Sequence, residues 1–331
     1  MIHPIPSGTR DVLPDETREL RMITDALRHV FERHGYGEVY TPALEYESVL
    51  ARARAGTGID GAGPVHRVFD AGETLVLRSD MTVPVARLVA TRYPDVTEPL
   101  RFCYFAHCYR GTRPQWSQPR ELLQAGIELI GAPAPGGTAE ALTVLCDSLD
   151  ATGLTDYRIG LGDASLFATL MDRLDIDPAA RPGLLETLAG RDFVELRQRL
   201  SAIGLSEESV TLLLGLSQRR GGPEVLEVSP GPASDAVAGM RQVGELLAPH
   251  IAERVIFDLG LVRSIGYYTG AIFEVYDPAL GVPIGGGGRY DELLGRFGSS
   301  RPAVGFALDV ERLHIALAGE ERGTGVVVGP R

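Results

Sequence analysis

Four short segments of the chain hold more polar and glycine residues than folding alone requires. Their side chains include a carboxylate and a hydroxyl that could accept from an ammonium group, an arginine that could clamp a carboxylate, and tyrosines beside it that could help to hold a ring. Each signal also has a purely structural explanation. The segments cover residues 77–82, 109–128, 258–270 and 285–291.

The first segment lies where a predicted strand passes into a predicted helix, and it reads Leu-Arg-Ser-Asp-Met-Thr. Asp80 and Thr82 could accept hydrogen bonds from an ammonium group. Aspartate and threonine are also good residues for capping the N-terminus of a helix. Taken alone, the segment favours the capping explanation.

The second segment belongs to a predicted long hairpin, with strands at residues 101–110 and 121–130 joined by a polar loop. Residues of one parity share a face of a strand, so Gln124, Gly126 and Glu128 line one side of the second strand. An amide and a carboxylate that flank a glycine form a polar floor with room for a ligand above it. The alternative is an ordinary solvated strand face.

The third and fourth segments combine an arginine, tyrosines and glycines. Arg263 precedes Tyr267 and Tyr268, and it could clamp a carboxylate while a tyrosine stacks on a ring. The four glycines at 285–288 permit the backbone to approach a ligand or another strand closely. A tight hairpin turn explains these glycines equally well. The G-x-x-x-x-G-K-[ST] pattern of a phosphate-binding loop is absent from the segment.

Composition argues against several classes of protein. The 331 residues carry a formal net charge of −12, which counts weakly against a nucleic-acid-binding surface. No apolar run reaches the roughly 18 residues that a membrane span needs. The N-terminus lacks the pattern of a secretory signal, so we expect a cytoplasmic protein. Cys103, Cys108 and Cys146 form no C-x-x-C pair and the histidines form no cluster, so we expect reduced thiols, no metal site and no cofactor.

The order of the predicted elements indicates an α+β fold with a mostly antiparallel sheet, because strands follow one another through hairpins more often than through regular crossovers. Residues 165–250 are rich in Leu, Arg, Glu and Ala at helical spacing, which predicts a helical insertion. The expected division is a first core part (1–164), the helical insertion (165–250), a second core part (251–320) and a tail (321–331). The predicted helices cover 15–34, 82–93, 138–151 and 309–318, and the remaining predicted strands cover 38–42, 74–78, 157–162, 254–259, 270–276 and 303–308.

Together, the order and spacing of these segments resemble the histidyl-tRNA synthetase group of class II aminoacyl-tRNA synthetases. The resemblance covers nearly all of residues 4–318 and implies a class II synthetase-like, mostly antiparallel sheet flanked by helices, with a small helical insertion. The matching segments are the Gly-Thr-Arg-Asp opening at 8–11, motif 1 at 31–46, which forms a dimer interface in the family, motif 2 at 101–131, two histidine-specific signatures at 261–270 and 286–291, and motif 3 at 302–313.

The resemblance implies roles for particular residues. Positions that hold the histidine ammonium in the family match Asp80, Thr82 and Gln124. Positions that read the imidazole ring match Glu128 and Tyr268, and Tyr290 lines the same pocket. Arg263 matches an arginine near the histidine carboxylate and the α-phosphate, whereas the motif arginines that grip ATP match Arg110 and Arg312.

The sequence departs from a synthetase in three respects. The anticodon-binding domain that follows motif 3 in the family is not expected here. The motif 2 loop has Thr112 where synthetases have a glutamate and Gln118 where they have an arginine, which removes ATP contacts. Motif 3 has Asp309 where a glycine is usual, and a carboxylate there would oppose a polyphosphate. We interpret Arg110, Thr112, Gln118, Asp309 and Arg312 as a vestigial ATP site.

These departures resemble the branch of the family that regulates ATP phosphoribosyltransferase. The resemblance implies a non-catalytic subunit that assembles with a short-form catalytic subunit for the first step of histidine biosynthesis and binds L-histidine as a feedback effector. It implies a homodimer within a hetero-octamer, without tRNA or a membrane. The alternative is an enzyme, either a truncated histidyl-tRNA synthetase or another amino-acid adenylate former, because Arg110, Arg263 and Arg312 persist.

Overall fold

A large, mostly antiparallel sheet organises the molecule. The computed structural model describes residues 5–54, 65–111, 119–227, 231–263 and 266–322. Within them, only the β1–β5 and β7–β9 pairs of this sheet are parallel, so the predicted α+β class with a mostly antiparallel sheet is confirmed. In spatial order the strands are β1 (Gly37–Glu38), β5 (Leu100–Tyr109), β6 (Glu121–Ile130), β12 (Ala303–Asp309), β11 (Gly285–Arg289), β10 (Ala271–Tyr276), β7 (Arg158–Asp163), β9 (Val255–Asp258) and β8 (Arg220–Gly221).

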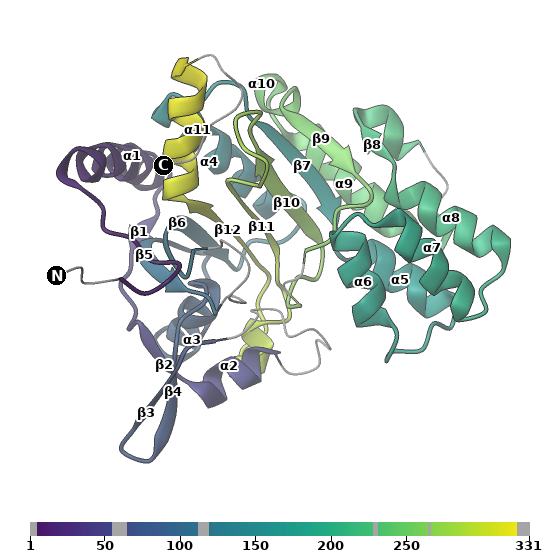
Figure 1. Cartoon of the computed structure of the whole chain (residues 1–331), viewed down its shortest axis with the longest axis horizontal. Coiled ribbons are helices and arrows are strands. Elements are labelled where there is room, and N and C mark those ends of the chain that lie inside the picture. Colours follow the sequence, from purple (N-terminus) through teal and green to yellow (C-terminus); the bar gives the residue numbers. More distant parts are fainter. Residues whose placement is uncertain (1–4, 55–64, 112–118, 228–230, 264–265, 323–331) are drawn as a thin grey trace.

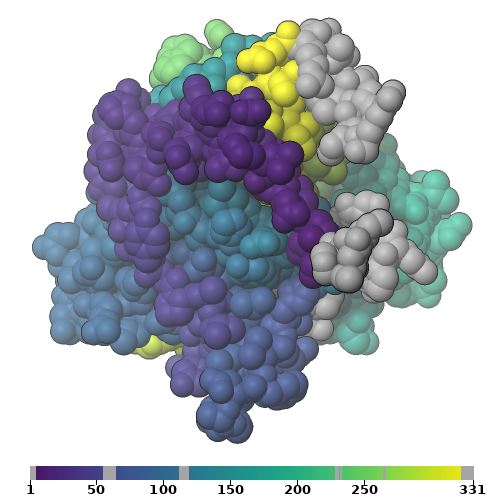
Figure 2. Space-filling view, turned by 60° about the vertical axis from the view of Figure 1, so that its left-hand side comes forward, coloured from purple at the N-terminus to yellow at the C-terminus, as the bar shows by residue number. Residues whose placement is uncertain are grey.

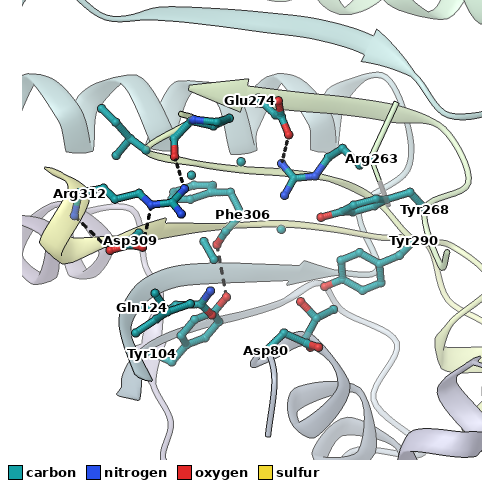
Figure 3. A pocket seen from close by; sticks show the side chains of 18 of the residues that line it. Asp80, Tyr104, Gln124, Arg263, Tyr268, Glu274, Tyr290, Phe306, Asp309 and Arg312 are labelled. Carbon is teal, nitrogen blue, oxygen red and sulfur yellow. Dashed lines mark hydrogen bonds and ion pairs between the residues drawn. The ribbon is translucent and has the colours of Figure 1, made fainter. Parts of the chain in front are cut away.

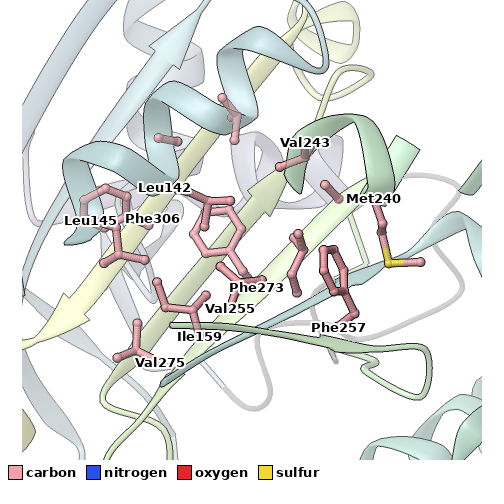
Figure 4. Packing of buried hydrophobic residues seen from close by; sticks show 14 of the residues in the cluster. Leu142, Leu145, Ile159, Met240, Val243, Val255, Phe257, Phe273, Val275 and Phe306 are labelled. Atoms are coloured by element: carbon pink, nitrogen blue, oxygen red, sulfur yellow. The ribbon is translucent and has the colours of Figure 1, made fainter. Parts of the chain in front are cut away.

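Three long helices cover one face of the sheet (Figure 1). They are α1 (Pro14–Arg33), α4 (Gly136–Thr152) and α11 (Val310–Arg322). In α1, a proline and two acidic residues suit the first turn, and Leu20, Ile23, Leu27 and Phe31 repeat at helical spacing to face the core. In Figure 4, Leu142 and Leu145 of α4 lie among phenylalanines of the strands below.

The opposite face holds a second apolar cluster and a small sheet. Strand alternation decides which residues go where: on β5, Cys103 joins the main core while Phe102 and Tyr104 join the second cluster. Helix α3 (Thr82–Arg92) packs against this face. Beside it lie α2 (Glu47–Arg54) and a three-stranded sheet of β2 (Leu44–Tyr46), β4 (Glu73–Leu77) and β3 (Arg67–Asp70). The cavity described below opens on this side.

Residues 165–250 are mainly helical, as expected, but they also share the main core. The helices are α5 (Ser165–Arg173), α6 (Arg181–Ala189), α7 (Phe193–Ala202), α8 (Glu207–Ser217), α9 (Ser234–Leu246) and α10 (Pro249–Ala252). Strand β8 extends the large sheet, and Met240 and Val243 of α9 point toward the strands in Figure 4. The boundaries at 164 and 250 stay a prediction. In the described part of the chain, no separate anticodon-binding domain is present.

Three local differences from the predicted elements have physical reasons. The predicted strand at 38–42 is only Gly37–Glu38, which lies at the edge of the large sheet and pairs with β5 alone among the described strands. Strand β3 was not predicted, since all four of its residues are exposed and give no hydrophobic alternation. The glycines at 285–288 form strand β11, so their interpretation as a tight turn was wrong.

Candidate functional site

A cavity of about 260 Å³ lies over strands β6, β12, β11 and β10. Its wall contains most of the predicted site residues, which come from five separate stretches of sequence. Figure 3 shows Tyr268, Tyr290 and Asp80 on one side and Arg312 with Asp309 on the opposite side. The lining includes Asp80, Thr82, Arg110, Gln124, Arg263, Tyr268, Tyr290, Asp309 and Arg312. Thr112 and Gln118 lie outside the described residues.

Glycines on three neighbouring strands make room for the side chains of the site. A Cβ at Gly286 would lie 2.0 Å from the Nη1 atom of Arg263, and a Cβ at Gly305 would lie 2.0 Å from an oxygen of Glu128. At Gly126 it would lie 2.6 Å from the hydroxyl of Tyr104. The functional groups therefore rest directly against the backbone of the sheet, and close approach explains these glycines.

Glu128 is the centre of a buried hydrogen-bond cluster beneath the cavity wall. Its carboxylate accepts from the hydroxyls of Tyr290, Thr82 (2.7 Å) and Tyr104 (3.4 Å). Burial raises the pKa of Glu128 to about 8, while the bonds from Tyr290 and Thr82 act in the opposite direction. Glu128 is not a lining residue in this structure, and it reaches the cavity through Tyr290 and Thr82. The alternative interpretation of this strand face as solvated is wrong, because Glu128 is only 1% exposed.

Asp80 combines a structural role with a place at the cavity. One of its oxygens accepts from the backbone N–H of Val83, in the first turn of α3, at 3.1 Å. The other accepts from the hydroxyl of Ser79 at 3.2 Å. Thr82 donates its hydroxyl to Glu128 instead of capping the helix. Helix capping therefore accounts for one of the two contacts of Asp80. It does not account for Thr82, which belongs to the buried cluster around Glu128.

Gln124 presents an unsatisfied acceptor in the cavity wall. The side chain is 6% exposed, and its Oε1 atom has no hydrogen-bond partner among the described residues. An amide oxygen buried without a partner costs free energy comparable to a lost hydrogen bond. A ligand that donates from an N–H would remove this cost.

Arg263 lies at the cavity with one built-in counter-ion. Its Nη1 atom donates to the carbonyl oxygen of Phe273 at 3.1 Å and lies 3.5 Å from an oxygen of Glu274. The guanidinium carbon lies 5.7 Å from the centre of the Tyr268 ring. Contacts with Tyr268 and Glu274 outweigh the effect of burial and raise the pKa of Arg263. The arginine is thus charged and held where an anionic group could meet it.

The far end of the cavity holds a closed acid–base pair. Asp309 lies 3.2 Å from the Nε atom of Arg312 and accepts from the backbone N–H of that residue at 3.1 Å. Arg312 also donates to the carbonyl oxygen of Pro283 at 2.7 Å. Burial raises the pKa of Asp309, while Arg312 acts against this shift. The guanidinium of Arg312 is therefore already engaged by Asp309 and by the Pro283 carbonyl.

Three ionisable lining residues were not predicted as site residues: Tyr104, Tyr267 and Glu274. The ring of Tyr267 lies between two others, 5.2 Å from that of Tyr268 and 5.9 Å from that of Tyr290. Glu274 had a detectable signal, since it is the one charged residue in the apolar strand Ala-Ile-Phe-Glu-Val-Tyr. No comparable signal marks Tyr104.

Three further observations concern the cysteines, the possible metal ligands and the length of the helices. The three cysteines are free and buried, and burial raises the pKa of each thiol to about 12. Among the described residues, no group of three or more His, Cys, Asp or Glu side chains could hold a metal ion. Within the same ranges, no helix is both long and apolar enough to cross a membrane.

Comparison with known proteins places the fold and the family. The family model for histidyl-tRNA synthetase matches residues 8–313. A solved structure described as an ATP phosphoribosyltransferase regulatory subunit/histidyl-tRNA synthetase from Bacillus halodurans has a TM-score of 0.84 and 31% identity, over 99% of this chain and 92% of that one. Histidyl-tRNA synthetase from Nostoc, at 22% identity and a TM-score of 0.79, shares the fold.

Curated relatives narrow the family further. The ATP phosphoribosyltransferase regulatory subunit of Symbiobacterium thermophilum is 40% identical over 318 residues, which is 94% of this chain and 79% of that protein. The protein of the same name from Desulforamulus reducens is 39% identical over 317 residues, with 94% and 78% covered. The chain therefore belongs to the family of ATP phosphoribosyltransferase regulatory subunits, which share the class II fold of the histidyl-tRNA synthetases.

Proposed function

We propose that the chain is a non-catalytic regulatory subunit that binds free L-histidine in the cavity. In this proposal it assembles with a short-form ATP phosphoribosyltransferase, whose reaction is the first step of histidine biosynthesis, and transmits feedback inhibition to it. The observation that carries the proposal is the pairing, in one cavity, of an acidic and amide wall with a half-buried arginine. Those are the two kinds of partner that an α-amino acid needs.

The ammonium group of histidine finds acceptors on one side of the cavity. Asp80 supplies a carboxylate, and the unpartnered Oε1 atom of Gln124 supplies an amide oxygen. An ammonium group has three N–H donors and no acceptor, so it suits a wall of oxygen atoms. Arg263 suits the carboxylate of the same ligand, because charge-assisted bonds to carboxylate are about twice as strong as neutral ones.

The imidazole ring fits the tyrosine side of the cavity. Tyr268 and Tyr290 provide aromatic surface, and the hydroxyl of Tyr290 and that of Thr82 are both anchored by the Glu128 carboxylate. A hydroxyl whose proton is committed to a carboxylate presents its lone pairs to the cavity, where an imidazole N–H could donate. Glu128 would thus make the imidazole subsite an accepting one.

The pairing of Arg312 with Asp309 supports a non-catalytic role. A polyphosphate at that end would have to displace Asp309 and the Pro283 carbonyl from the arginine. The unpaired Asp309 carboxylate would then repel the phosphates in a partly dry site. Catalysis of adenylate formation needs the arginine in the opposite state, free to stabilise charge that develops on phosphate.

The proposed homodimer needs a surface for self-association, and exposed aromatic residues near the predicted motif 1 segment suit that role. Tyr40 and Tyr46 are 81% and 53% exposed, and Phe69 on the β3–β4 hairpin is 81% exposed. Figure 2 shows this hairpin, in blue, projecting from the body of the molecule. Exposed aromatic side chains in one region are typical of protein interfaces. They support a homodimer, which the hetero-octamer would contain.

Assembly with a short-form catalytic subunit tests the proposed function directly. The two proteins should copurify, light scattering should give a mass well above that of either alone, and the mixture should form phosphoribosyl-ATP faster than the catalytic subunit alone. Free histidine should inhibit the mixture, and calorimetry should show that histidine binds to the isolated chain. A monomer that ignores the catalytic subunit would contradict the proposal.

The second candidate is an adenylate-forming enzyme, which the presence of Arg110, Arg263 and Arg312 around one cavity favours. Pyrophosphate exchange with histidine and ATP separates the two functions. We expect the isolated chain to show no histidine-dependent exchange above background, because Arg312 is already paired with Asp309. Asp309→Gly restores the residue usual in synthetases and is the informative companion variant. Exchange well above background in the unmodified chain would establish the enzyme instead.

A further inference from the structure

Two charged residues, Arg289 and Asp291, flank Tyr290 in the sequence, and neither of them lines the cavity. Alternate residues of a strand point to opposite faces of the sheet, so Arg289 at the end of β11 points away from the cavity that Tyr290 lines. Arg289 is 2% exposed and donates to the carbonyl oxygen of Ala132 at 3.1 Å and to the hydroxyl of Thr138 in α4 at 3.4 Å. A charge buried to this extent needs an ionic partner.

Asp291 supplies that partner through both of its carboxylate oxygens. The Nη2 atom of Arg289 lies 2.7 Å from one oxygen, and the Nε atom donates to the other at 3.2 Å. Side chains two residues apart in an extended segment lie on the same face, which permits this geometry. Two-bond pairs of arginine and carboxylate are strong and also specific in their geometry. The ion pair therefore restrains the backbone of Tyr290, which lies between its two members.

Three further hydrogen bonds fasten the same backbone to its neighbours. The N–H of Tyr290 donates to the carbonyl oxygen of Ala303, the first residue of β12, at 2.9 Å. The N–H of Ala303 in turn donates at 2.8 Å to Asp291, through the oxygen that also lies 2.7 Å from the arginine. The N–H of Asp291 donates to the hydroxyl oxygen of Thr269 at 3.0 Å. Tyr290 is thus held on both sides, by β12 and by the segment before β10.

We propose that Arg289 and Asp291 are positioning residues of the cavity, which hold the hydroxyl of Tyr290 in place against Glu128. The inference rests on the proposed binding of histidine. The hydroxyl lies at the far end of its side chain, so a small rotation of the backbone displaces it further than the rest of the residue. Binding groups must stay within about 0.5 Å and 10–20° of the productive geometry. The ion pair provides this precision without contacting the ligand.

Asp291→Asn, titrated with free histidine by calorimetry, tests this role. The amide keeps an oxygen for the N–H of Ala303 but loses the charge that pairs with Arg289. Histidine binding should weaken about tenfold, which is within the range of coupling between residues of one hydrogen-bond network. In a Tyr290→Phe background, which lacks the hydroxyl, the same substitution should change the affinity less than about threefold. A merely structural role would lower the unfolding temperature in both backgrounds and would not make the effect on affinity depend on this hydroxyl.

Asp150→Asn is the matched control. The side chain of Asp150 is 43% exposed, against 41% for that of Asp291, and it pairs with Arg254, which does not line the cavity. Its substitution should leave the histidine affinity within about threefold of the wild type. If Asp291→Asn fails to fold, Thr269→Val removes the acceptor of the Asp291 N–H and should give the same loss, with the same dependence on the Tyr290 hydroxyl.

Three results overturn the positioning role alone. The first is an unchanged histidine affinity in folded Asp291→Asn, and the second is a loss that is equal with and without the Tyr290 hydroxyl. The third is a loss in Asp150→Asn as large as that in Asp291→Asn. A wild-type chain that gives no heat of binding with histidine overturns the proposed function, and the positioning role with it.

Discussion

Arg263→Met is expected to weaken the binding of free histidine at least a hundredfold. The substitution removes a charged donor that lies at the cavity and, in the proposed complex, pairs with the ligand carboxylate. A charge-assisted hydrogen bond contributes about 1.5–3 kcal/mol, and tenfold in affinity is about 1.4 kcal/mol. The second part of the loss comes from Glu274, which faces the same cavity and would lose its counter-ion.

The two parts of this loss can be separated. In Arg263→Met, the ligand carboxylate meets the uncompensated charge of Glu274, and like charges in a partly dry site repel strongly. Arg263→Met combined with Glu274→Gln removes that repulsion but not the missing donor. The double variant should therefore recover about tenfold of the lost affinity. Calorimetry gives both values, and thermal unfolding shows that the variants are folded.

Arg312→Met is the matched control at the other end of the cavity. It removes the same kind of side chain, but one that is already bound by Asp309 and by the Pro283 carbonyl. Histidine affinity should change less than about threefold. Two outcomes would show that the ligand does not place its carboxylate at Arg263. One is an equal loss of affinity in Arg263→Met and Arg312→Met, and the other is an unchanged affinity in Arg263→Met.

The polar floor on β6 is the part of the site that the sequence predicts most directly. Strand alternation alone places Gln124, Gly126 and Glu128 on one face, and the structure has them there. Alternation does not tell whether that face is covered. Here Tyr104, Tyr290 and Thr82 cover Glu128, and Tyr290 comes from a position 162 residues further along the chain. Only the resemblance to a family could join such distant segments.

The glycine strand and the closed pair at the far end show two other limits. Glycine has a low preference for strands, so Gly285–Arg289 carries no local strand signal, and its neighbours β10 and β12 on either side impose the conformation. The contact between Asp309 and Arg312 could have been predicted from the sequence, because residues three apart at the start of a helix are neighbours. It changes the interpretation of Asp309 from a free repelling charge to the partner of an arginine.

Glu128→Gln is expected to weaken histidine binding about ten- to a hundredfold while the chain stays folded. The carboxylate accepts from Tyr290 and Thr82 through different oxygens, whereas a glutamine side chain can accept through only one. One hydroxyl must therefore turn, and it then offers its proton to the cavity instead of its lone pairs. The lost charge-assisted bond is worth roughly 1.5–3 kcal/mol, which corresponds to the expected range of affinity.

The pH dependence gives this prediction a sign. The pKa of Glu128 is about 8 in the folded chain, against an ordinary value of 4.5. Between these values the folded chain keeps a proton that the unfolded chain has released, so this group's contribution to stability falls as pH rises, by up to about 1.4 kcal/mol per pH unit. Glutamine has no such proton. The stability of Glu128→Gln should therefore lack this decline between about pH 5 and 8.

Histidine binding should follow the same proton. At pH 7 most Glu128 carboxyls are protonated in the empty site, so binding that uses the carboxylate must release a proton. Wild-type affinity should rise from pH 7 to 8 by no more than about tenfold and then level off, whereas that of Glu128→Gln should stay level. Calorimetry in buffers of different ionisation enthalpy measures the released proton. Glu121→Gln, the same change on the opposite face of β6, should behave as the wild type.

The assembled complex gives the functional counterpart. With the catalytic subunit, Glu128→Gln should stay active and resist inhibition by histidine, because the buried cluster shapes the pocket and lies away from the exposed surface. An inhibition curve beside the calorimetric titration tests whether the two shift by the same factor. Equal shifts tie feedback to this cavity. If Glu128→Gln binds histidine as tightly as the wild type, the cavity is a structural relic of the synthetase fold, and the feedback signal is sensed elsewhere.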